Sequence, residues 1–415
     1  MYSYMNKFDL NKTIDPVTPD ELVEKYWEKD FLHLTRNNSD YYKSLFNISD
    51  VEDILATTAS KPEFAVTVVD KSTGTVKTAE PRPTANAVMK SFREGSTIKI
   101  MDLGRFNPNI KHLENDIRNY FNTDIAINMY LTPPNSQGFK YHYDRHDVFI
   151  LQIEGSKDWK IYEPPVKLPI EKVVGRGSLF KLKLPFDDEY GGFIDLSGKK
   201  VNEIRIQSGD MFFIPRGFIH EAKTSGELSM HLTVGLYEIT WYEALINTLA
   251  YTYPHNELLR KSLPPRFANR LLANDAVADE IDKMSKEISS IIPELITPER
   301  IKQAVDNLAS RFVYASKPPV DGIITENAVL DDVTLDTEVR IRPELNCKTV
   351  LKDEQLYLLY SGKYLELPAR TGEMLDYMMQ KNRFKIGSIQ TKLNDDSKLT
   401  LVKHLLKNGF LTLAK

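Results

Sequence analysis

The sequence predicts a mixed α+β protein in which a double-stranded β-helix, or jelly-roll barrel, is followed by a helical region and a winged-helix domain. From Ile125 to Val234, short β-prone runs such as AINMYL and DVFILQI alternate with turns rich in Gly, Pro and Asn. From about residue 240 to 312 the apolar spacing becomes helical, and the tail then combines a hairpin, short helices and a closing strand. We therefore expect domains at residues 1–238, 239–314 and 322–415.

The residues before the barrel predict helices and two strands. Residues 19–58 have the pattern of a helix, a short strand and one or two further helices, with Ser49 and Asp50 as a capping start. Residues 64–70, FAVTVVD, predict a strand, and residues 109–121 carry apolar side chains at the spacing of an amphipathic helix. The barrel domain thus begins with N-terminal helices.

Beyond the barrel, the pattern predicts an assembly region and the tail domain. Long helical patterns fill residues 240–312, interrupted by prolines, and residues 315–321 (ASKPPVD) predict a linker. Their apolar stripes exceed what a bridge between two domains requires, so we expect a homodimer built on them. In the tail, Ser361 and Gly362 are the expected turn of a hairpin. Helices are expected at residues 371–380, 385–393 and 398–407, before a last strand.

Composition limits the kind of protein. The chain has 415 residues, of which 41% are hydrophobic and 27% charged, as in globular proteins. It contains no run of about eighteen apolar residues, and its start, MYSYMNKFDLNKTIDP, lacks the basic and apolar parts of a signal peptide. We therefore expect a soluble, cytoplasmic protein with no membrane partner. The single cysteine, Cys347, excludes an internal disulfide and zinc clusters built from cysteines.

The charge is unevenly distributed. Residues 339–415 contain 14 Lys and Arg against 8 Asp and Glu, a net +6, so residues 1–338 sum to −10 within the total of −4. A basic tail permits contact with nucleic acid or an acidic peptide. The lysines are scattered, however, which is also the pattern of a solvated surface.

Candidate metal ligands stand beside two β-prone runs. In YHYDRHDVFI, His142 and Asp144 are two positions apart, and alternate residues of a strand project from one face. His220 follows the run DMFFIPRGFI, 78 positions after His142. Two imidazoles and one carboxylate leave three octahedral positions open, which suits a non-haem Fe(II) that binds a co-substrate and O₂. His146 and Asp147 form a competing pair, but adjacent strand residues face opposite ways.

The open positions suit 2-oxoglutarate as co-substrate. Its keto and carboxylate oxygens fill two of them, and its distal carboxylate then needs a cation. Lys157, expected in the turn after the strand beside the ligands, is a candidate because a flexible ammonium can make a charge-assisted hydrogen bond. Spacing alone allows an exposed turn lysine equally well.

The stretch NMYLTPPNSQGFKYHYDRHDVFILQIEGSKDWKIYEPP, from Asn128 to Pro165, closely resembles the JmjC-type ribosomal oxygenases, which hydroxylate side chains of ribosomal proteins. YWEKDFL, IPRGFIHEA and SMHLTVGLY are similar to the family too. The resemblance implies Fe(II) held by His142, Asp144 and His220, and 2-oxoglutarate held by Lys157. It also implies a JmjC, cupin-like barrel, a helical dimerisation region and a winged helix, in that order.

The resemblance also bears on residues around the metal. It assigns Asn128 to the co-substrate pocket and Tyr130 to the substrate, although Tyr130 could equally be a barrel aromatic whose hydroxyl finds a partner. His231 would close the site as a fourth ligand, so we interpret it as a supporting residue. Animal members carry a substrate-contacting serine where this chain has Gly235, so their histidine substrate is not implied. Residues 175–192 form a long insert, expected over the barrel mouth.

Three function classes remain open at this stage. The leading hypothesis is hydroxylation of a side chain of a protein or peptide, such as a ribosomal protein or a precursor peptide. A JmjC-type lysine demethylase would need a pocket for a methylated ammonium, which the sequence does not identify. A non-enzymatic regulator would sense a small molecule in the barrel and bind DNA through the winged helix, but residues 385–393 offer few side chains for base edges. The winged helix could instead grip a peptide or a ribosomal partner by strand addition.

Overall fold

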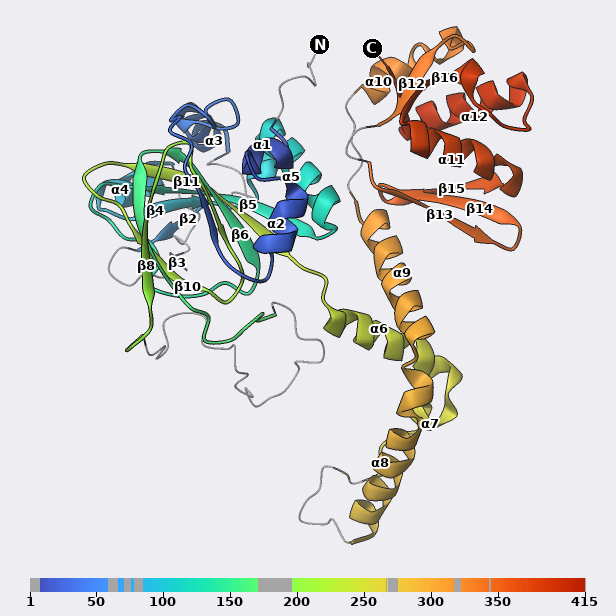
Figure 1. Cartoon of the computed structure of the whole chain (residues 1–415), viewed down its shortest axis with the longest axis horizontal. Coiled ribbons are helices and arrows are strands. Elements are labelled where there is room, and N and C mark those ends of the chain that lie inside the picture. The colour runs from blue at the N-terminus through green and yellow to red at the C-terminus, as the bar shows by residue number, and fades with distance from the viewer. Residues whose placement is uncertain are drawn as a thin grey trace. The chain divides into compact units, whose positions relative to one another are not determined.

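The structure is a computed structural model that describes residues 8–58, 66–70, 76–77, 85–170, 196–265, 267, 275–316, 322–342 and 345–414. The chain divides into two compact units, Met1–Glu238 and Ile239–Lys415, and each is described by itself (Figure 1). The insert predicted at residues 175–192 lies outside the described residues, as does most of the linker predicted at residues 315–321.

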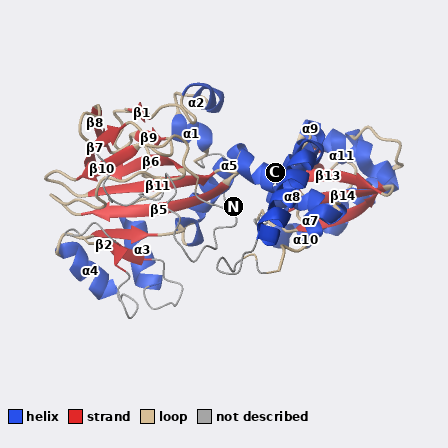
Figure 2. Ribbon diagram, turned by 90° about the horizontal axis from the view of Figure 1, so that it is seen from below, coloured by secondary structure: helices blue, strands red, loops and turns tan. Residues whose placement is uncertain are grey.

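Two antiparallel sheets form the first unit. The larger sheet has the strand order β1-β9-β6-β11-β5-β4-β2-β3, and the smaller one β10-β7-β8 (Figure 2). The larger sheet contains β1 (Leu32–Leu34), β2 (Val66–Val69), β3 (Val76–Lys77), β4 (Thr97–Ile100), β5 (Asp124–Thr132), β6 (Asp147–Glu154), β9 (Met211–Ile214) and β11 (Ser229–Tyr237). The smaller sheet contains β7 (Ser156–Tyr162), β8 (Val201–Gln207) and β10 (Ile219–Lys223). From β8 to β11 the chain passes back and forth between the smaller and the larger sheet, as in the predicted jelly roll.

Helices cover one face of the larger sheet. They are α1 (Leu10–Ile14), α2 (Pro19–Lys25), α3 (Ile48–Thr58), α4 (Ala85–Arg93) and α5 (Pro108–Phe121). The helix predicted at residues 109–121 is confirmed as α5, which Asn107 caps and which buries Ile110, Leu113 and Ile117. The helices and strands predicted within residues 19–58 and 64–70 are confirmed as well.

Strand β6 contains a continuous run of apolar residues, VFIL, because both of its faces are buried. Phe149 and Leu151 belong to the core that the sheet shares with the helices, whereas Val148 and Ile150 pack between the two sheets. Both faces of the strand are therefore buried, and both must be apolar. The neighbouring strands β4, β5 and β11 are apolar only on the helix side, so their alternate residues can be polar and face the smaller sheet.

The second unit begins with helices α6 (Trp241–Thr252), α7 (Glu257–Arg260), α8 (Asp275–Leu295), α9 (Pro298–Tyr314) and α10 (Ile323–Asn327). It continues with sheets β13-β14-β15 and β16-β12-β17. Their bounds are β12 (Glu338–Ile341), β13 (Cys347–Lys352), β14 (Gln355–Tyr360), β15 (Lys363–Pro368), β16 (Arg383–Lys385) and β17 (Leu411–Leu413), with α11 (Gly372–Lys381) and α12 (Asp395–Lys407) between them. Within this unit α9 packs on α6 and contacts β13 and β14.

Most tail elements match the prediction, but one helix does not. Ser361 and Gly362 both have positive φ, 46° and 74°, which is the two-residue turn expected between β14 and β15. The helix predicted at residues 385–393 is wrong, because β16 ends at Lys385 and only a 3₁₀ turn, Ile386–Ser388, follows. The cause is strand pairing, since β16 lies along β12 and thereby buries Phe384.

Among the described residues, no helix is both long enough and apolar enough to cross a membrane.

Candidate functional site

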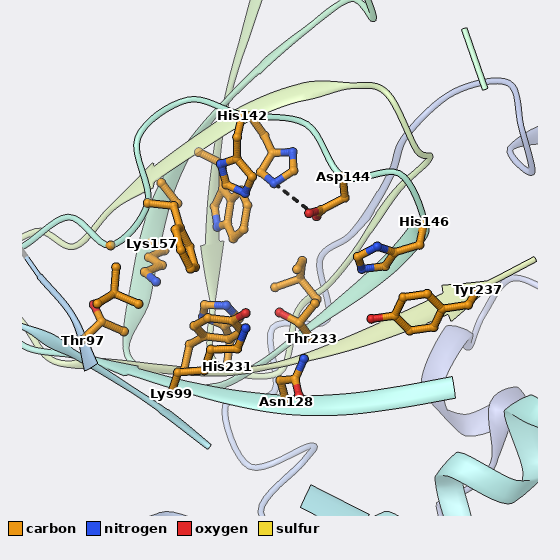
Figure 3. Close-up of a pocket in the computed structure, with 18 residues that line it drawn as sticks. Thr97, Lys99, Asn128, His142, Asp144, His146, Lys157, His231, Thr233 and Tyr237 are labelled. Carbon is orange, nitrogen blue, oxygen red and sulfur yellow. Dashed lines mark ion pairs between the residues drawn. The ribbon is translucent and has the colours of Figure 1, made fainter. Parts of the chain in front are cut away.

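A cavity of about 250 Å³ lies between the two sheets of the first unit (Figure 3). Both sheets and the loop before β6 supply its walls. The residues that line it are Val69, Thr97, Lys99, Asn128, Tyr130, Gly138, Phe139, His142, Asp144, His146, Ile150, Lys157, Trp159, His220, Ala222, His231, Thr233 and Tyr237.

The register of the larger sheet places the polar lining residues in rows. Lys99 on β4 pairs with Tyr130 on β5, which pairs with His231 on β11. In the adjacent row Asn128 pairs with Thr233. These residues alternate with the apolar ones that pack under the helices, so the two-residue period of the strands creates the polar wall.

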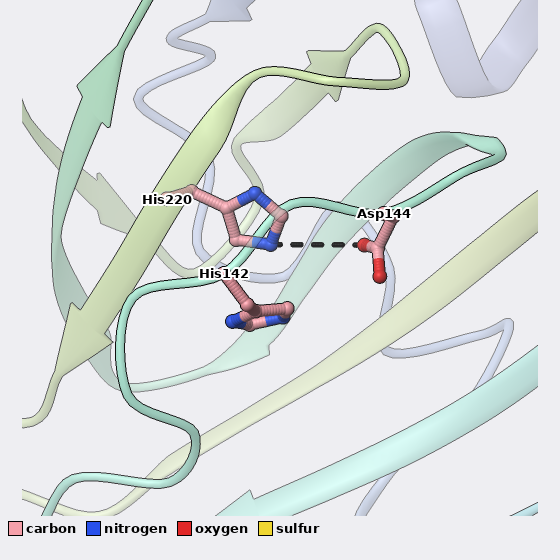
Figure 4. A group of neighbouring side chains, drawn as sticks. All are labelled: His142, Asp144 and His220. Carbon is pink, nitrogen blue, oxygen red and sulfur yellow. Dashed lines mark ion pairs between the residues drawn. The ribbon is translucent and has the colours of Figure 1, made fainter. Parts of the chain in front are cut away.

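His142, Asp144 and His220 come together at one end of the cavity (Figure 4). Their candidate ligand atoms all lie within 4.8 Å of one another, and His220 Nε2 is 3.6 Å from Asp144 Oδ2. The spacing of His142 and Asp144 predicts that both lie on one strand. In the structure both precede β6. His142 forms an isolated bridge with His220, in which each backbone N–H donates to the other residue's carbonyl at 3.1 and 2.7 Å.

Backbone carbonyls fix the tautomers of both histidines. His142 Nδ1 lies 2.7 Å from the carbonyl oxygen of Lys140, and His220 Nδ1 lies 3.0 Å from that of Phe218. A carbonyl can only accept, so each Nδ1 carries the proton and donates, which leaves the Nε2 lone pair for a metal.

The electrostatics favour the same ligand forms. Burial, followed by the neighbouring His142, lowers the pKa of His220 to about 4, so this imidazole is neutral at pH 7. Burial opposes ionisation of Asp144, but His146, the two candidate histidine ligands and Lys99 outweigh it and hold the pKa of Asp144 below its usual value. His220 therefore offers a neutral imidazole and Asp144 a carboxylate, both of which are ligand forms that fit Fe(II).

Lys157 lies on β7 rather than in the predicted turn, and its side chain is buried, with 4% exposure. Among the described residues it makes no hydrogen bond or ion pair, and burial lowers its pKa to about 7. His231 is close enough that Lys157 adds to the effect of burial in lowering the pKa of this imidazole, and His231 Nδ1 is buried without a partner within the described part of the chain. Two unsatisfied nitrogens side by side fit the distal carboxylate of 2-oxoglutarate.

Asn128 and Tyr130 both line the cavity, as the resemblance implied. Asn128 Oδ1 accepts the backbone N–H of Asp102 at 3.1 Å, and Figure 3 shows its amide nitrogen turned toward Thr233. The ring of Tyr130 stacks on His231, with 5.1 Å between centroids.

Gly235 leaves space for the ring of His146. A Cβ at Gly235 would lie 2.9 Å from Cδ2 and 3.0 Å from Nε2 of His146, so only glycine leaves room for this ring. His146 in turn stacks on Tyr237, with 4.5 Å between centroids, and both line the cavity. Asp147, the other half of the competing pair, is fully buried beside Arg216, at 3.4 Å.

Sequence reasoning set His146 aside and missed several other polar lining residues, among them Lys99, Thr233 and Tyr237. The signal for His146 was available, since it continues the two-residue spacing of His142 and Asp144. Lys99 occupies an ordinary alternating strand, TIKI, in which a lysine normally faces water. Only the pairing of β4 with β5 reveals that this face borders the cavity.

Residues 99–244 match the family model described as a JmjC domain. Among curated proteins, the "Bifunctional lysine-specific demethylase and histidyl-hydroxylase NO66" of Drosophila mojavensis is 26% identical over 322 residues, covering 75% of this chain and 35% of that protein. The protein of the same name from Aedes aegypti is 28% identical over 318 residues, covering 74% and 48%. The chain therefore spans about half the length, or less, of these relatives.

A solved structure, the "X-Ray structure of E. coli ycfD", aligns with a TM-score of 0.50 at 17% identity, covering 96% of this chain and 99% of that one. Together with the domain match, it confirms the JmjC, cupin-like α+β fold with antiparallel sheets. The predicted resemblance to JmjC proteins is likewise confirmed.

Proposed function

We propose that this chain is a 2-oxoglutarate- and Fe(II)-dependent oxygenase that hydroxylates a side chain of a protein or peptide, with ribosomal proteins and precursor peptides as candidate substrates. The observation that carries the proposal is the group of His142, Asp144 and His220, with both Nδ1 atoms committed to carbonyls and the ligand atoms within 4.8 Å. The printed name of the curated relatives includes histidyl-hydroxylase, which agrees with the proposal, and also lysine-specific demethylase.

Each residue has a defined part in this proposal. His142, Asp144 and His220 would hold Fe(II), and Lys157 with His231 would orient the distal carboxylate of 2-oxoglutarate, with Asn128 as a further donor to the co-substrate. The chemistry supplied when both are bound is R–H + O₂ + 2-oxoglutarate → R–OH + succinate + CO₂. Ile150 and Trp159, which belong to the apolar core between the two sheets, add an apolar part to the cavity wall. Tyr130 and the pair formed by Gly235 and His146 would contact or position the substrate.

The two alternatives have less support. A lysine demethylase must bind a methylated ammonium, but the cavity is already lined by two lysines, the buried Lys157 and the half-buried Lys99. A DNA-binding regulator would need a recognition helix at residues 385–393, where the structure has a strand end and a single 3₁₀ turn.

We further propose a homodimer and a tail that serves partner binding. Several apolar side chains on the helices of residues 240–312 are exposed in the single chain, among them Trp241 at 74% and Tyr253 at 52%. A second copy would cover them. The order of a hairpin, α11, α12 and β17 supports a winged-helix domain at residues 322–415. Its edge strand β13 would suit strand addition by a peptide more than base readout. A cytoplasmic location stays a prediction.

The proposed function is tested by turnover. Purified protein would be incubated with Fe(II), 2-oxoglutarate and candidate ribosomal proteins, while succinate formation and the intact mass of each candidate are measured. We expect succinate together with the gain of one oxygen on a substrate, both absent in Asp144→Ala. If wild-type protein forms no succinate with any candidate and does not bind Fe(II), the proposal is wrong.

A further inference from the structure

Besides Lys157, which would bind the co-substrate, the cavity is lined by a second lysine, Lys99, whose side chain is half-buried. Lys157 reaches the cavity from β7 of the smaller sheet, and Lys99 reaches it from β4 of the larger sheet (Figure 3). 2-Oxoglutarate has one distal carboxylate, so it satisfies one lysine. The other ammonium, that of the half-buried Lys99, lines the cavity and can offer its charge to a second bound anion.

Among the described residues, Lys99 makes no hydrogen bond or ion pair. Its Nζ lies 5.2 Å from the ring centroid of Tyr130 and 6.0 Å from that of Phe139, so aromatic faces are its neighbours. Burial lowers the pKa of Lys99, and Asp144 acts in the opposite direction. Asp144 cannot serve as its partner in the loaded enzyme, because this carboxylate is a proposed metal ligand.

The charges of the loaded site leave Lys99 uncompensated. With imidazoles counted as neutral, Asp144 (−1), Fe(II) (+2), 2-oxoglutarate (−2) and Lys157 (+1) sum to zero. Lys99 adds +1 on the wall formed by the larger sheet, which also carries the polar side chains of Asn128 and Thr233. A guanidinium or a methylated ammonium would meet repulsion here, whereas a carboxylate would neutralise the charge.

We propose that Lys99 binds a carboxylate of the substrate, so that the enzyme hydroxylates an aspartyl or glutamyl side chain rather than a basic one; this inference rests on the proposed function. The reaction converts a methylene C–H of that side chain to C–OH, with O₂ and 2-oxoglutarate consumed and succinate and CO₂ released. The ammonium of Lys99 orients the acid group and thereby selects which methylene faces the metal.

The test uses binding, with the full chain loaded with Mn(II) and N-oxalylglycine, a 2-oxoglutarate analogue that does not react with O₂. The probes are the N-acetyl methylamides of aspartate, asparagine and arginine, and the measurement is the relaxation of their side-chain methylene protons by Mn(II). We expect relaxation of the aspartate probe to exceed that of the arginine probe, and to fall at least about tenfold in Lys99→Met. Lys99→Arg should retain it because the charge is kept.

Lys160→Met is the matched control, since Lys160 is an exposed lysine on β7 paired with Glu203 at 3.3 Å. It should bind every probe as wild type does. N-Oxalylglycine affinity should be unchanged in Lys99→Met. Loss of that affinity would mean that both lysines bind the co-substrate and would overturn the inference. So would equal or absent relaxation of the three probes, or aspartate relaxation that survives in Lys99→Met, because the carboxylate would then bind the metal itself.

A separate turnover arm distinguishes this inference from the proposed function. Peptide pools centred on Asp, Glu, His or Arg would be incubated with Fe(II), 2-oxoglutarate and ¹⁸O₂, and the label located by mass spectrometry. Label on the acidic pools supports the inference, and label mainly on His or Arg overturns it while the oxygenase assignment stands. No label in any pool, with the Lys99-dependent binding intact, would refute the oxygenase and leave the anion site.

Discussion

Raising the pH should weaken co-substrate binding through Lys157. Burial lowers the pKa of its free ammonium to about 7, and a bound carboxylate favours the protonated form. The affinity for the distal carboxylate is therefore highest well below pH 7, where Lys157 is protonated in the free protein. It falls as the pH rises through 7 and goes on falling until the pH reaches the higher pKa that Lys157 has in the complex. With a pKa of about 7, the apparent Kd scales as 1 + 10^(pH−7). It should rise about fivefold from pH 7 to 8 and roughly another tenfold from pH 8 to 9.

Calorimetric titration of the Mn(II)-loaded protein with N-oxalylglycine would measure this. The same titration in buffers of different ionisation heat counts the protons taken up on binding, and about 0.9 proton per ligand is expected at pH 8. Lys157→Arg is the decisive control, because a guanidinium stays charged through pH 9 and should abolish the slope even where affinity is reduced. A wild-type Kd that is constant from pH 7 to 9, or an equal slope in Lys157→Arg, would refute the reasoning.

Three further predictions concern the metal site, Gly235 and assembly. His142→Ala or Asp144→Ala should lower iron content and turnover by more than about a hundredfold with the circular dichroism spectrum unchanged, because each removes one of three protein ligands; a variant that keeps wild-type turnover would disprove the site. Gly235→Ala should cost about 1–3 kcal/mol in urea unfolding because its Cβ would meet the ring of His146, and adding His146→Ala should relieve most of that cost; purely additive losses would contradict the contact. Light scattering should give a homodimer at micromolar concentration, and a monomer would rule out residues 240–312 as an assembly surface.

The barrel could be predicted from the sequence because the number of buried faces of a strand decides its pattern. A strand buried on one face alternates apolar and polar residues, and a strand buried on both faces is apolar throughout. Strand β6 is apolar at nearly every position because helices cover one face and the smaller sheet covers the other. Helix α5 can be recognised in the sequence by its cap at Asn107 and by the helical spacing of its apolar residues. The region 385–393 lacked such a signal. A three-residue strand followed by a 3₁₀ turn is too short for periodicity to separate it from a helix, and its pairing with β12 is non-local.

The candidate site could be predicted in part, and the limit lies in side-chain direction. His142, Asp144 and His220 could be predicted because two histidines and an aspartate beside β-prone runs suit a metal site. The expected position of His142 and Asp144 on one strand is wrong, because both precede β6. The assignment of Lys157 to the co-substrate depended on the family resemblance, because the neighbouring sequence does not distinguish a buried strand lysine from a turn lysine. Lys99 required the register of β4 against β5, which no local pattern contains.

The division of the site between two sheets has a consequence for specificity. His220 and Lys157 stand on the smaller sheet, close to the proposed metal and co-substrate. Lys99 and Thr233 stand on the larger sheet and form the wall that remains for a substrate. The two sheets have no strand in common. Residues on the wall formed by the larger sheet can therefore be substituted without moving His220 or Lys157 on the smaller sheet. At Gly235 the larger sheet presents no side chain and His146 occupies the space, while the three candidate ligands lie within 4.8 Å of one another.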